Sequence, residues 1–357
     1  MSPGWARTRE NTLQTGLSFV MPVLNESRYL TEAVTSILQQ EVDGESELIL
    51  ALGPSTDDTD EVAQRLSDAA DGRIRLVRNP RANIPAGLNA AIGAAKYPVI
   101  VRVDAHCEIP TDYAARALAT LERTGAANVG GIMVATGTAV VQRAVARAYN
   151  SKLGLGGPSF HSGGEEGPSE SAYLGVFLRD VLDEVGMYDE SVLRGEDWEL
   201  NLRIRSAGYL VWFDPELKVI YRPRASLGAV ARQFFATGAW RGELARRDPR
   251  ATSLRYFAPP ALVAAVLAGI VVSSIAALSP GLAGKPWWLA AAWSPALVYL
   301  MTILVATARD SEAHSLADRI ATLAVLPTMH VAWGTGFWKG LLRGARRTND
   351  RSRVLRP

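Results

Sequence analysis

The chain has 357 residues, of which 48% are hydrophobic, and its formal net charge is +2. A chain of this length and composition can bury one substantial core and still have apolar sequence left over. The near balance of charge gives no footprint for a polyanion, so nucleic acid is not an expected partner. The single cysteine, Cys107, excludes an internal disulfide and fits a reducing compartment.

Residues 1–16 are polar and lack the apolar stretch of a signal peptide, so we interpret them as a polar extension. Residues 17–225 then alternate short β-branched runs with amphipathic stretches. The expected strands are Leu17–Val23, Leu48–Leu52, Ile74–Val77 and Val99–Val103, and the expected helices are Glu26–Gln39, one beginning near Ser55–Asp58, and Asn83–Lys96. This order predicts an α/β fold with a doubly wound, mostly parallel sheet, in which ligands bind at the carboxyl ends of the strands.

The second half of this domain is less regular. Six glycines and two prolines fall between Gly154 and Glu170, which predicts a flap that closes over substrate, with disorder without function as the alternative. The elements expected after it are the strand Ala172–Leu178, the helix Glu196–Ser206, and the short strands Leu210–Phe213 and Leu217–Tyr221. Residues 226–255 contain a basic amphipathic stretch, Leu227–Arg247, that is typical of a helix lying on a membrane surface.

Residues 256–341 are predicted to be a membrane region. Two uncharged runs are long enough to cross a bilayer, at about 258–279 and 287–308, and the second opens with two tryptophans that favour the interface. Two buried helices of a soluble domain are the alternative, although such helices are seldom this long without charge. A third run, 320–338, spans or re-enters. Basic residues both before the first run and in the tail, 342–357, favour two crossings with the third run in the interface.

The fourth expected strand ends in Val103-Asp104-Ala105-His106. In an extended chain, Asp104 and His106 point to the same side. A carboxylate and an imidazole at this spacing can hold one divalent cation, and these ligands suit Mn²⁺ or Mg²⁺ on a diphosphate. The alternative is that Asp104 caps a turn and His106 is an ordinary surface histidine.

A second acidic pair, Glu196 and Asp197, begins the helix expected at Glu196–Ser206. An inverting sugar transfer needs one general base to remove the proton of the acceptor hydroxyl, and positive charge on the departing diphosphate. One metal pair and one later carboxylate meet this requirement in minimal form. The alternative is that these acids serve only the dipole at the start of the helix.

Three stretches resemble glycosyltransferase family 2 in their order and spacing. They are Phe19–Glu26 (FVMPVLNE), Asp104–His106, and Gly195–Asp197 followed by Leu202–Gly208. The resemblance is closest to the succinoglycan-biosynthesis glucosyltransferase group, whose metal step also reads Asp-Ala-His, and it covers roughly residues 17 to 250. It implies a GT-A fold, followed here by an α-helical membrane region, and inversion at the anomeric carbon.

The resemblance also implies roles for single residues. The nucleotide-sugar site it implies consists of Pro22, Val23, Asn25, Glu26, Asn89, Arg102 and Asp104. Asp104 and His106 would hold the metal, Mn²⁺ or Mg²⁺, and Asp197 would be the catalytic base with Glu196 beside it. The implied acceptor or diphosphate site consists of Gln233, Trp240 and Arg241. The family order there is Gln…Arg-Trp, so a membrane-surface helix whose arginines meet lipid phosphates is the alternative.

One position departs from the family pattern. After the second strand the family places an aspartate that pairs with uracil, but here that stretch reads Ala51-Leu52-Gly53-Pro54-Ser55. Leu52 cannot make this hydrogen bond. Either Asp57 or Asp58 substitutes for it, or the base is recognised differently.

The resulting prediction is a hexosyltransferase of the inner membrane, multi-pass, with its catalytic domain in the cytoplasm. Its partners are a nucleotide-sugar donor, UDP-sugar by family resemblance, and a lipid-linked or glycan acceptor. A polyprenyl-phosphate sugar synthase is the alternative enzyme, and a non-catalytic membrane scaffold the alternative of another class. A nicotinamide dehydrogenase is disfavoured because the turn after Val23 lacks Gly-x-Gly-x-x-Gly.

Overall fold

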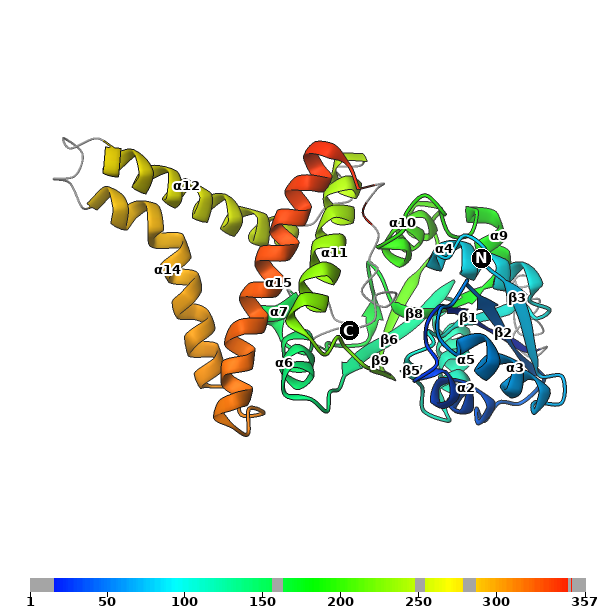
Figure 1. Ribbon diagram of the computed structural model, residues 1–357. Helices are drawn as coiled ribbons and strands as arrows, with labels where there is room; N and C mark the ends of the chain where they lie inside the picture. The colour runs from blue at the N-terminus through cyan, green and yellow to red at the C-terminus, as the bar shows by residue number, and fades with distance from the viewer. Residues whose placement is uncertain (1–15, 156–162, 248–253, 279–286, 346–347, 349–357) are drawn as a thin grey trace. The chain divides into compact units, whose positions relative to one another are not determined.

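The computed structural model describes residues 16–155, 163–247, 254–278, 287–345 and 348 (Figure 1). The contacts divide the chain into two compact units. One comprises residues 1–135, 157–222 and 353–357, and the other comprises residues 136–156 and 223–352. The predicted N-terminal extension and most of the predicted basic tail lie outside the described residues.

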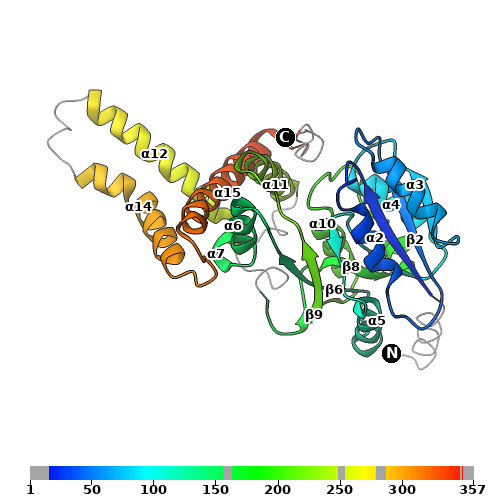
Figure 2. The same ribbon diagram turned by 60° about the horizontal axis from the view of Figure 1, so that its bottom comes forward.

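Four parallel strands form the first half of a sheet in the first unit. They are β1 (Leu17–Val23), β2 (Ser46–Leu52), β3 (Ile74–Arg78) and β4 (Val99–Arg102), in the order β3-β2-β1-β4. The helices that connect them are α2 (Leu30–Leu38), α3 (Thr59–Asp68) and α4 (Ile84–Ala94). Right-handed crossovers place α2 and α3 on one face and α4 on the other, so the strands are buried on both faces (Figure 2).

The second half of the sheet is mixed. β8 (Tyr173–Leu178) pairs antiparallel with β4, and β6 (Asn128–Ala135), β9 (Val211–Tyr221) and β5 (Cys107–Glu108) follow in that order. Within the described residues the sheet has nine strands, because β7 (Gly167–Pro168) also pairs with β9. The helices of this half are α5 (Tyr113–Thr124), α9 (Arg179–Val185) and α10 (Glu196–Ser206).

Two features of this half differ from expectation. The two strands expected at 210–213 and 217–221 are one strand, β9, whose pairing with β6 shifts register between Gly130 and Ile132. A side chain at Gly131 would place its Cβ 1.7 Å from the carbonyl oxygen of Leu217, so only glycine fits beside this irregularity. The expected flap is described only in part: 156–162 lie outside the described residues, whereas Gly167–Pro168 pairs with the sheet.

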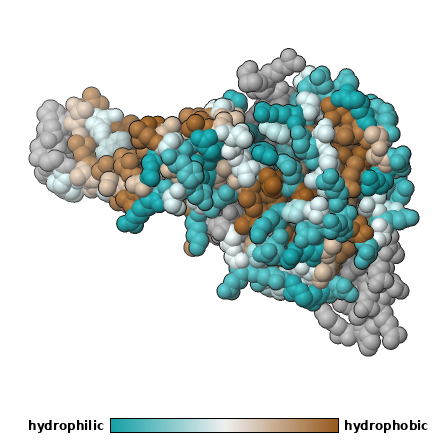
Figure 3. Space-filling model, turned by 90° about the horizontal axis from the view of Figure 1, so that it is seen from below, coloured by the Kyte–Doolittle hydropathy of each residue, from teal (hydrophilic) through white to brown (hydrophobic). Residues whose placement is uncertain are grey.

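The second unit is helical. Its helices are α6 (Val140–Tyr149), α7 (Lys152–Leu155), α11 (Leu227–Arg247), α12 (Ala258–Leu278), α14 (Trp287–Ala308) and α15 (Leu316–Arg343), with a 3₁₀ turn at Leu254–Phe257. Among the described residues, α12, α14 and α15 are long and apolar enough to cross a membrane. Apolar side chains gather along the arm formed by α12 and α14 (Figure 3), where large residues such as Leu267, Val271 and Val298 are exposed. Such an outward-facing apolar surface is typical of a membrane-embedded helix.

Helices α11 and α15 pack unusually closely through two pairs of glycines. A Cβ at Gly238 would lie 2.0 Å from the carbonyl oxygen of Trp333, and one at Gly242 would lie 2.2 Å from that of Phe337. The reciprocal positions on α15 are Gly336, 2.1 Å from the carbonyl oxygen of Phe235, and Gly340, 1.8 Å from that of Ala239. Because both contacts advance by four residues in the same direction on each helix, the two helices run parallel with their backbones in contact.

The third apolar run forms the middle of one continuous helix, α15, and Pro327 lies within this helix without ending it. Its large exposed apolar residues recur at helical spacing. They are Leu316, Ile320, Val331, Trp338 and Leu342. This stripe fits a helix that lies in the membrane interface, whereas the opposite side of the helix packs on α11. Whether the run spans or lies in the interface stays a prediction.

Candidate active site

The candidate site lies where the parallel order of the sheet reverses. From β1 the chain passes to β2 on one side, whereas β4 pairs with β1 on the other side. The segments that follow β1 and β4 therefore lie next to each other at the carboxyl edge of the sheet. Crevices at such switch points are the usual ligand sites of open α/β sheets.

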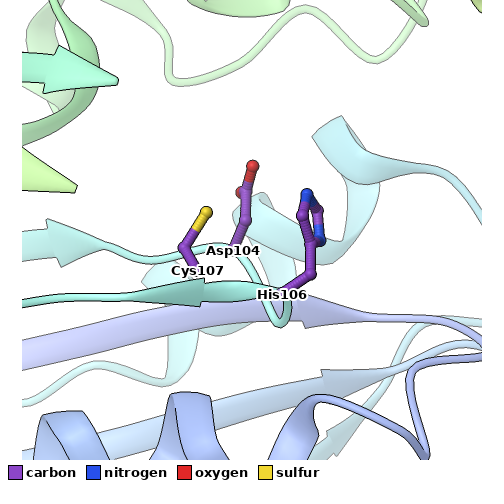
Figure 4. Close-up of side chains that lie close together, drawn as sticks. All are labelled: Asp104, His106 and Cys107. Atoms are coloured by element: carbon purple, nitrogen blue, oxygen red, sulfur yellow. The ribbon is translucent and has the colours of Figure 1, made fainter. Parts of the chain in front are cut away.

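Asp104 and His106 are brought together by a turn and not by alternation along a strand. β4 ends at Arg102, and the backbone N–H of Cys107 donates to the carbonyl of Asp104 over 2.9 Å. One ligand atom each from Asp104, His106 and Cys107 lie within 4.8 Å of one another, and the three side chains project to the same side (Figure 4). This set of oxygen, nitrogen and sulfur donors could hold a divalent metal. The expected convergence of Asp104 and His106 is observed, but the strand argument for it was wrong.

Arg102 is the centre of the site's charges. Its guanidinium is 3% exposed and donates from Nε to Asp104 over 3.2 Å, from one terminal nitrogen to Asp197, and from the other to Glu196 over 3.2 Å. The ring of Tyr188 lies 5.8 Å from the guanidinium carbon. Asp104 and the acidic pair at the start of α10, which are distant in sequence, therefore share one buried cation.

The pKa of the Asp197 carboxyl is raised from 3.8 to about 8. Burial away from water is the largest cause, Arg102 opposes it, and the negative charges of Glu196 and Asp104 add to it. Burial alone would lower the pKa of Arg102, but the carboxylates of Asp104, Asp197 and Glu196 outweigh that effect and raise it. The arginine thus stays charged, while Asp197 is set to take up and release a proton near neutral pH.

The segment after β1 contributes Glu26, which is 5% exposed and lies with Oε1 3.2 Å from Nδ1 of His106. Its neighbour Asn25 adopts a left-handed backbone, with φ of 55°, and its side-chain oxygen accepts from the backbone N–H of Thr56 over 2.7 Å. Asn25 therefore ties the loop after β1 to the loop after β2. Pro22 and Val23 lie at the end of β1, with Val23 buried and Pro22 partly exposed.

Asp57 is not available as a substitute for the missing uracil-binding aspartate. Oδ2 accepts hydrogen bonds from the backbone and the hydroxyl of Ser27, and Oδ1 accepts from the backbone and the hydroxyl of Thr59. Burial raises the pKa of Asp57, but these hydrogen bonds outweigh it and hold the pKa below its usual value. Asp58 is exposed, and Leu52 is buried at the end of β2.

Asn89, whose part in donor binding stays a prediction, holds a loop of the protein. Its amide donates to the backbone carbonyl of Tyr188 over 2.9 Å and to Glu190 over 3.2 Å, and its oxygen accepts from the backbone N–H of Tyr188 over 3.0 Å. With its amide group engaged in this way, Asn89 acts on the site by positioning Tyr188 against Arg102.

The residues of the implied acceptor site lie on α11, in the helical unit. Trp240 is 1% exposed and donates its indole N–H to the backbone carbonyl of Thr348 over 2.9 Å. Whether it contacts an acceptor stays a prediction. The guanidinium of Arg241 lies 4.2 Å from the ring centre of Tyr256. Gln233 is 8% exposed, and its buried side-chain oxygen accepts no hydrogen bond from any residue that the structure describes.

Known proteins resemble this chain in sequence. Residues 18–186 match the family described as Glycosyl transferase family 2. The succinoglycan biosynthesis protein ExoA of Rhizobium meliloti is 30% identical over 92% of this chain and 96% of its own length. A dolichyl N-acetyl-alpha-D-glucosaminyl phosphate 3-beta-D-2,3-diacetamido-2,3-dideoxy-beta-D-glucuronosyltransferase of Methanococcus voltae is 23% identical over 92% of this chain and 98% of its own.

Among solved structures, residues 1–349 of TarS of S. aureus align with a TM-score of 0.44 at 14% identity, covering 63% of this chain and 64% of that one. The family match spans β1 to β4 and the turn that bears Asp104 and His106. The relative at 30% identity extends the likeness over α10 and the helical unit. With its GT-A-like mixed sheet and apolar C-terminal helices, the chain belongs to glycosyltransferase family 2.

Proposed function

We propose that the protein is an inverting hexosyltransferase that moves a sugar from a nucleotide-sugar donor to a hydroxyl of a lipid-linked glycan. The observation that carries this proposal is the clustering of Asp104, Glu196 and Asp197 around Arg102, because it joins the donor end of the sheet to the start of α10. One carboxylate from each segment is what an inverting transfer uses: one beside the diphosphate and one at the acceptor hydroxyl.

Asp197 serves as the base in this proposal. Its side chain is 28% exposed, so an acceptor hydroxyl can reach it, although Arg102 holds the carboxylate in place from below. Its raised pKa matches the proton affinity that a general base needs near neutral pH. Glu196, which is 7% exposed, is more deeply buried and keeps the second carboxylate against Arg102.

Asp104 and His106 are the residues that would hold a divalent metal, Mn²⁺ or Mg²⁺. When bound, such an ion neutralises the charge of the departing diphosphate. Glu26 orients His106, and Arg102 orients Asp104 while placing a fixed positive charge behind it. We propose a UDP-sugar donor, whose base is held without the side chain of Asp57 because both oxygens of that carboxylate are already hydrogen-bonded.

A lipid-linked acceptor fits the helical unit. The Methanococcus relative is named for transfer to a dolichyl-phosphate-linked sugar, and the Rhizobium relative is named for polysaccharide synthesis. We propose that α12 and α14 cross the inner membrane and return. Arg143 and Arg147 of α6 bond to Asp318 at the start of α15. The end of α14 that leads into α15 therefore lies on the same side of the proposed membrane as α6, and α6 follows β6 in the chain. A hairpin that crosses and returns begins and ends on one side of the membrane, and the basic end of α11 precedes α12 on that side. Basic segments favour the cytoplasm, so we assign this side to the cytoplasm.

The decisive experiment replaces the base. We expect Asp197→Asn to lower turnover by about 10²–10⁴-fold, because the acceptor proton loses its receiver. Metal-dependent UDP binding, measured by titration calorimetry, stays within about twofold because the donor contacts are elsewhere. Asp183→Asn, an exposed aspartate on α9, is the matched control and retains full turnover.

Near-normal turnover of Asp197→Asn would favour the polyprenyl-phosphate sugar synthase, because an ionised phosphate acceptor needs no base. A wild-type protein that binds neither metal nor UDP would be the non-catalytic scaffold. The first outcome is measured on the purified variant and the second on the purified wild-type protein, both in detergent.

A further inference from the structure

The turn after β4 places a sulfur atom beside the oxygen and nitrogen of the proposed metal site. Sγ of Cys107, a carboxylate oxygen of Asp104 and a ring nitrogen of His106 lie within 4.8 Å of one another. Donor atoms that share one tetrahedral zinc ion lie roughly 3.3–3.8 Å apart, given bond lengths of about 2.0–2.3 Å. The three donors therefore lie close enough to be candidates for ligands of one ion.

Each of the three donors is oriented by a partner behind it. Nδ1 of His106 lies 3.2 Å from Glu26, and ligating histidines commonly hold their second nitrogen against a carboxylate in this way, which leaves Nε2 for the ion. The hydroxyl of Tyr173 on β8 lies 3.3 Å from Sγ of Cys107. Arg102 holds Asp104. Each of the three candidate ligands is thus oriented by its own partner, and the partners come from different parts of the unit. This is the arrangement expected of a metal site and not of a chance cluster.

Burial fits an ion that approaches from one side. Cys107 is 0% exposed, whereas the side chains of Asp104 and His106 are 16% and 14% exposed. The thiol therefore forms the floor of the site, and the carboxylate and imidazole form its open side. An ion bound there is in contact with sulfur on the protein side and with solvent or diphosphate on the other.

We propose that Asp104, His106 and Cys107 form a mixed oxygen, nitrogen and sulfur site that binds Zn²⁺ and Co²⁺ more tightly than Mn²⁺ or Mg²⁺. A thiolate is a soft ligand and discriminates against the hard cations, which prefer oxygen. On binding, the sulfur–metal bond forms as the thiol releases its proton to solvent. The inference rests on the proposed function only in that Asp104 and His106 are shared with the donor site.

The test uses Co²⁺ as a spectroscopic probe on the purified, metal-free, full-length protein in detergent, without donor. A cobalt–thiolate bond gives a charge-transfer band in the near ultraviolet, and because the chain has one cysteine the band reports Cys107 alone. We expect the band to saturate at one Co²⁺ per chain. Cys107→Ser abolishes it and weakens competing Zn²⁺ binding by about tenfold or more, with Mn²⁺ binding less affected.

Two further variants separate ligation from folding. His106→Asn weakens Co²⁺ binding, and His314→Asn, at an exposed histidine, leaves it unchanged. If Cys107→Ser does not fold, the band of the wild-type protein still decides the question.

Co²⁺ binding without the band would overturn sulfur ligation and leave the proposed function intact. A saturating band in a protein that transfers no sugar would support this site and contradict the proposed function.

Discussion

Each unit of the protein contains a cluster of ion pairs around arginine, and the two clusters differ in their balance of charge. In the first unit, one guanidinium, Arg102, bonds to three carboxylates. In the second unit, two arginines of α6, Arg143 and Arg147, bond to two aspartates, Asp310 and Asp318, around the start of α15. The Arg102 cluster therefore has an excess of negative charge, and the α6 cluster has none.

This difference in charge balance indicates a functional site at Arg102 and a purely structural contact at α6. A balanced cluster satisfies its own charges and holds helices in register, so it needs no further ion from solution. An unbalanced cluster raises the pKa of one of its acids and attracts a cation or a proton, which is the usual state of a catalytic site. The comparison predicts that changes at Arg102 affect chemistry and stability together, whereas changes at Arg147 affect stability alone.

The largest expected effect is that of Arg102→Gln. It leaves the buried Glu196 and the partly exposed Asp104 and Asp197 without their shared cation, which costs about 3–5 kcal/mol in the free energy of unfolding. Turnover falls by about 10³-fold or more because the base and the metal ligand lose their shared anchor. Thermal unfolding and sugar transfer in detergent measure the two effects, and Arg102→Lys restores part of the stability. Unchanged turnover in a folded Arg102→Gln protein would show that Arg102 serves stability alone.

The next effect is a dependence on pH. Because the pKa of Asp197 is raised to about 8, most of the base is protonated at pH 6 and ionised at pH 9. Turnover at low substrate concentration should therefore rise by up to about tenfold per pH unit below 8 and level off above it. The Asp197→Asn variant should show no such rise in its residual rate. A wild-type rate that falls between pH 6 and 8 would exclude Asp197 as the base.

The smallest effect on activity is that of Arg147→Gln. Arg147 is 9% exposed, and its removal should lower the free energy of unfolding by about 2–4 kcal/mol because Asp310 and Asp318 both lose an ion-pair partner. Turnover per folded molecule changes by less than about twofold, since no proposed site residue is touched. Arg309→Gln, at an exposed position, is the control for loss of charge. A change in the pH profile of Arg147→Gln would show that the α6 cluster is part of the site.

Local patterns predicted most of the elements and missed the contacts between them. β1, α10 and α11 have the expected bounds, because alternation, an acidic first turn and amphipathic spacing are properties of short stretches. The bond between Arg102 and Asp197 joins residues 95 positions apart, and no local pattern reports such a pair. The family resemblance placed Arg102 in the donor site, but its contacts with Asp104, Glu196 and Asp197 could be found only in the structure.

Polar residues in loops were the least predictable. Asn25 and Asn89 carry the hydrogen-bonding groups of ligand residues, yet both are engaged with the protein's own loops. Cys107 was interpreted only as a reduced thiol, because the turn that brings it beside Asp104 contains no glycine or proline to announce it. Sequence gives the donor and acceptor capacity of a side chain, whereas its partner depends on where neighbouring segments end.

The glycines of α11 and α15 set a limit on how the membrane region can deform. The backbones of α11 and α15 are in contact at the glycine positions. No side chain lies between them there whose rearrangement could change the distance between the helices. By contrast, α12 and α14 meet through side chains, as in the hydrogen bond of 3.0 Å from the indole N–H of Trp293 to the hydroxyl of Ser273. In the proposed membrane hairpin, α12 and α14 can therefore change their tilt when the surrounding bilayer becomes thicker or thinner, because these side chains can slide past one another. The glycine-paired helices α11 and α15 keep their spacing, so they form a rigid pair relative to which α12 and α14 can move.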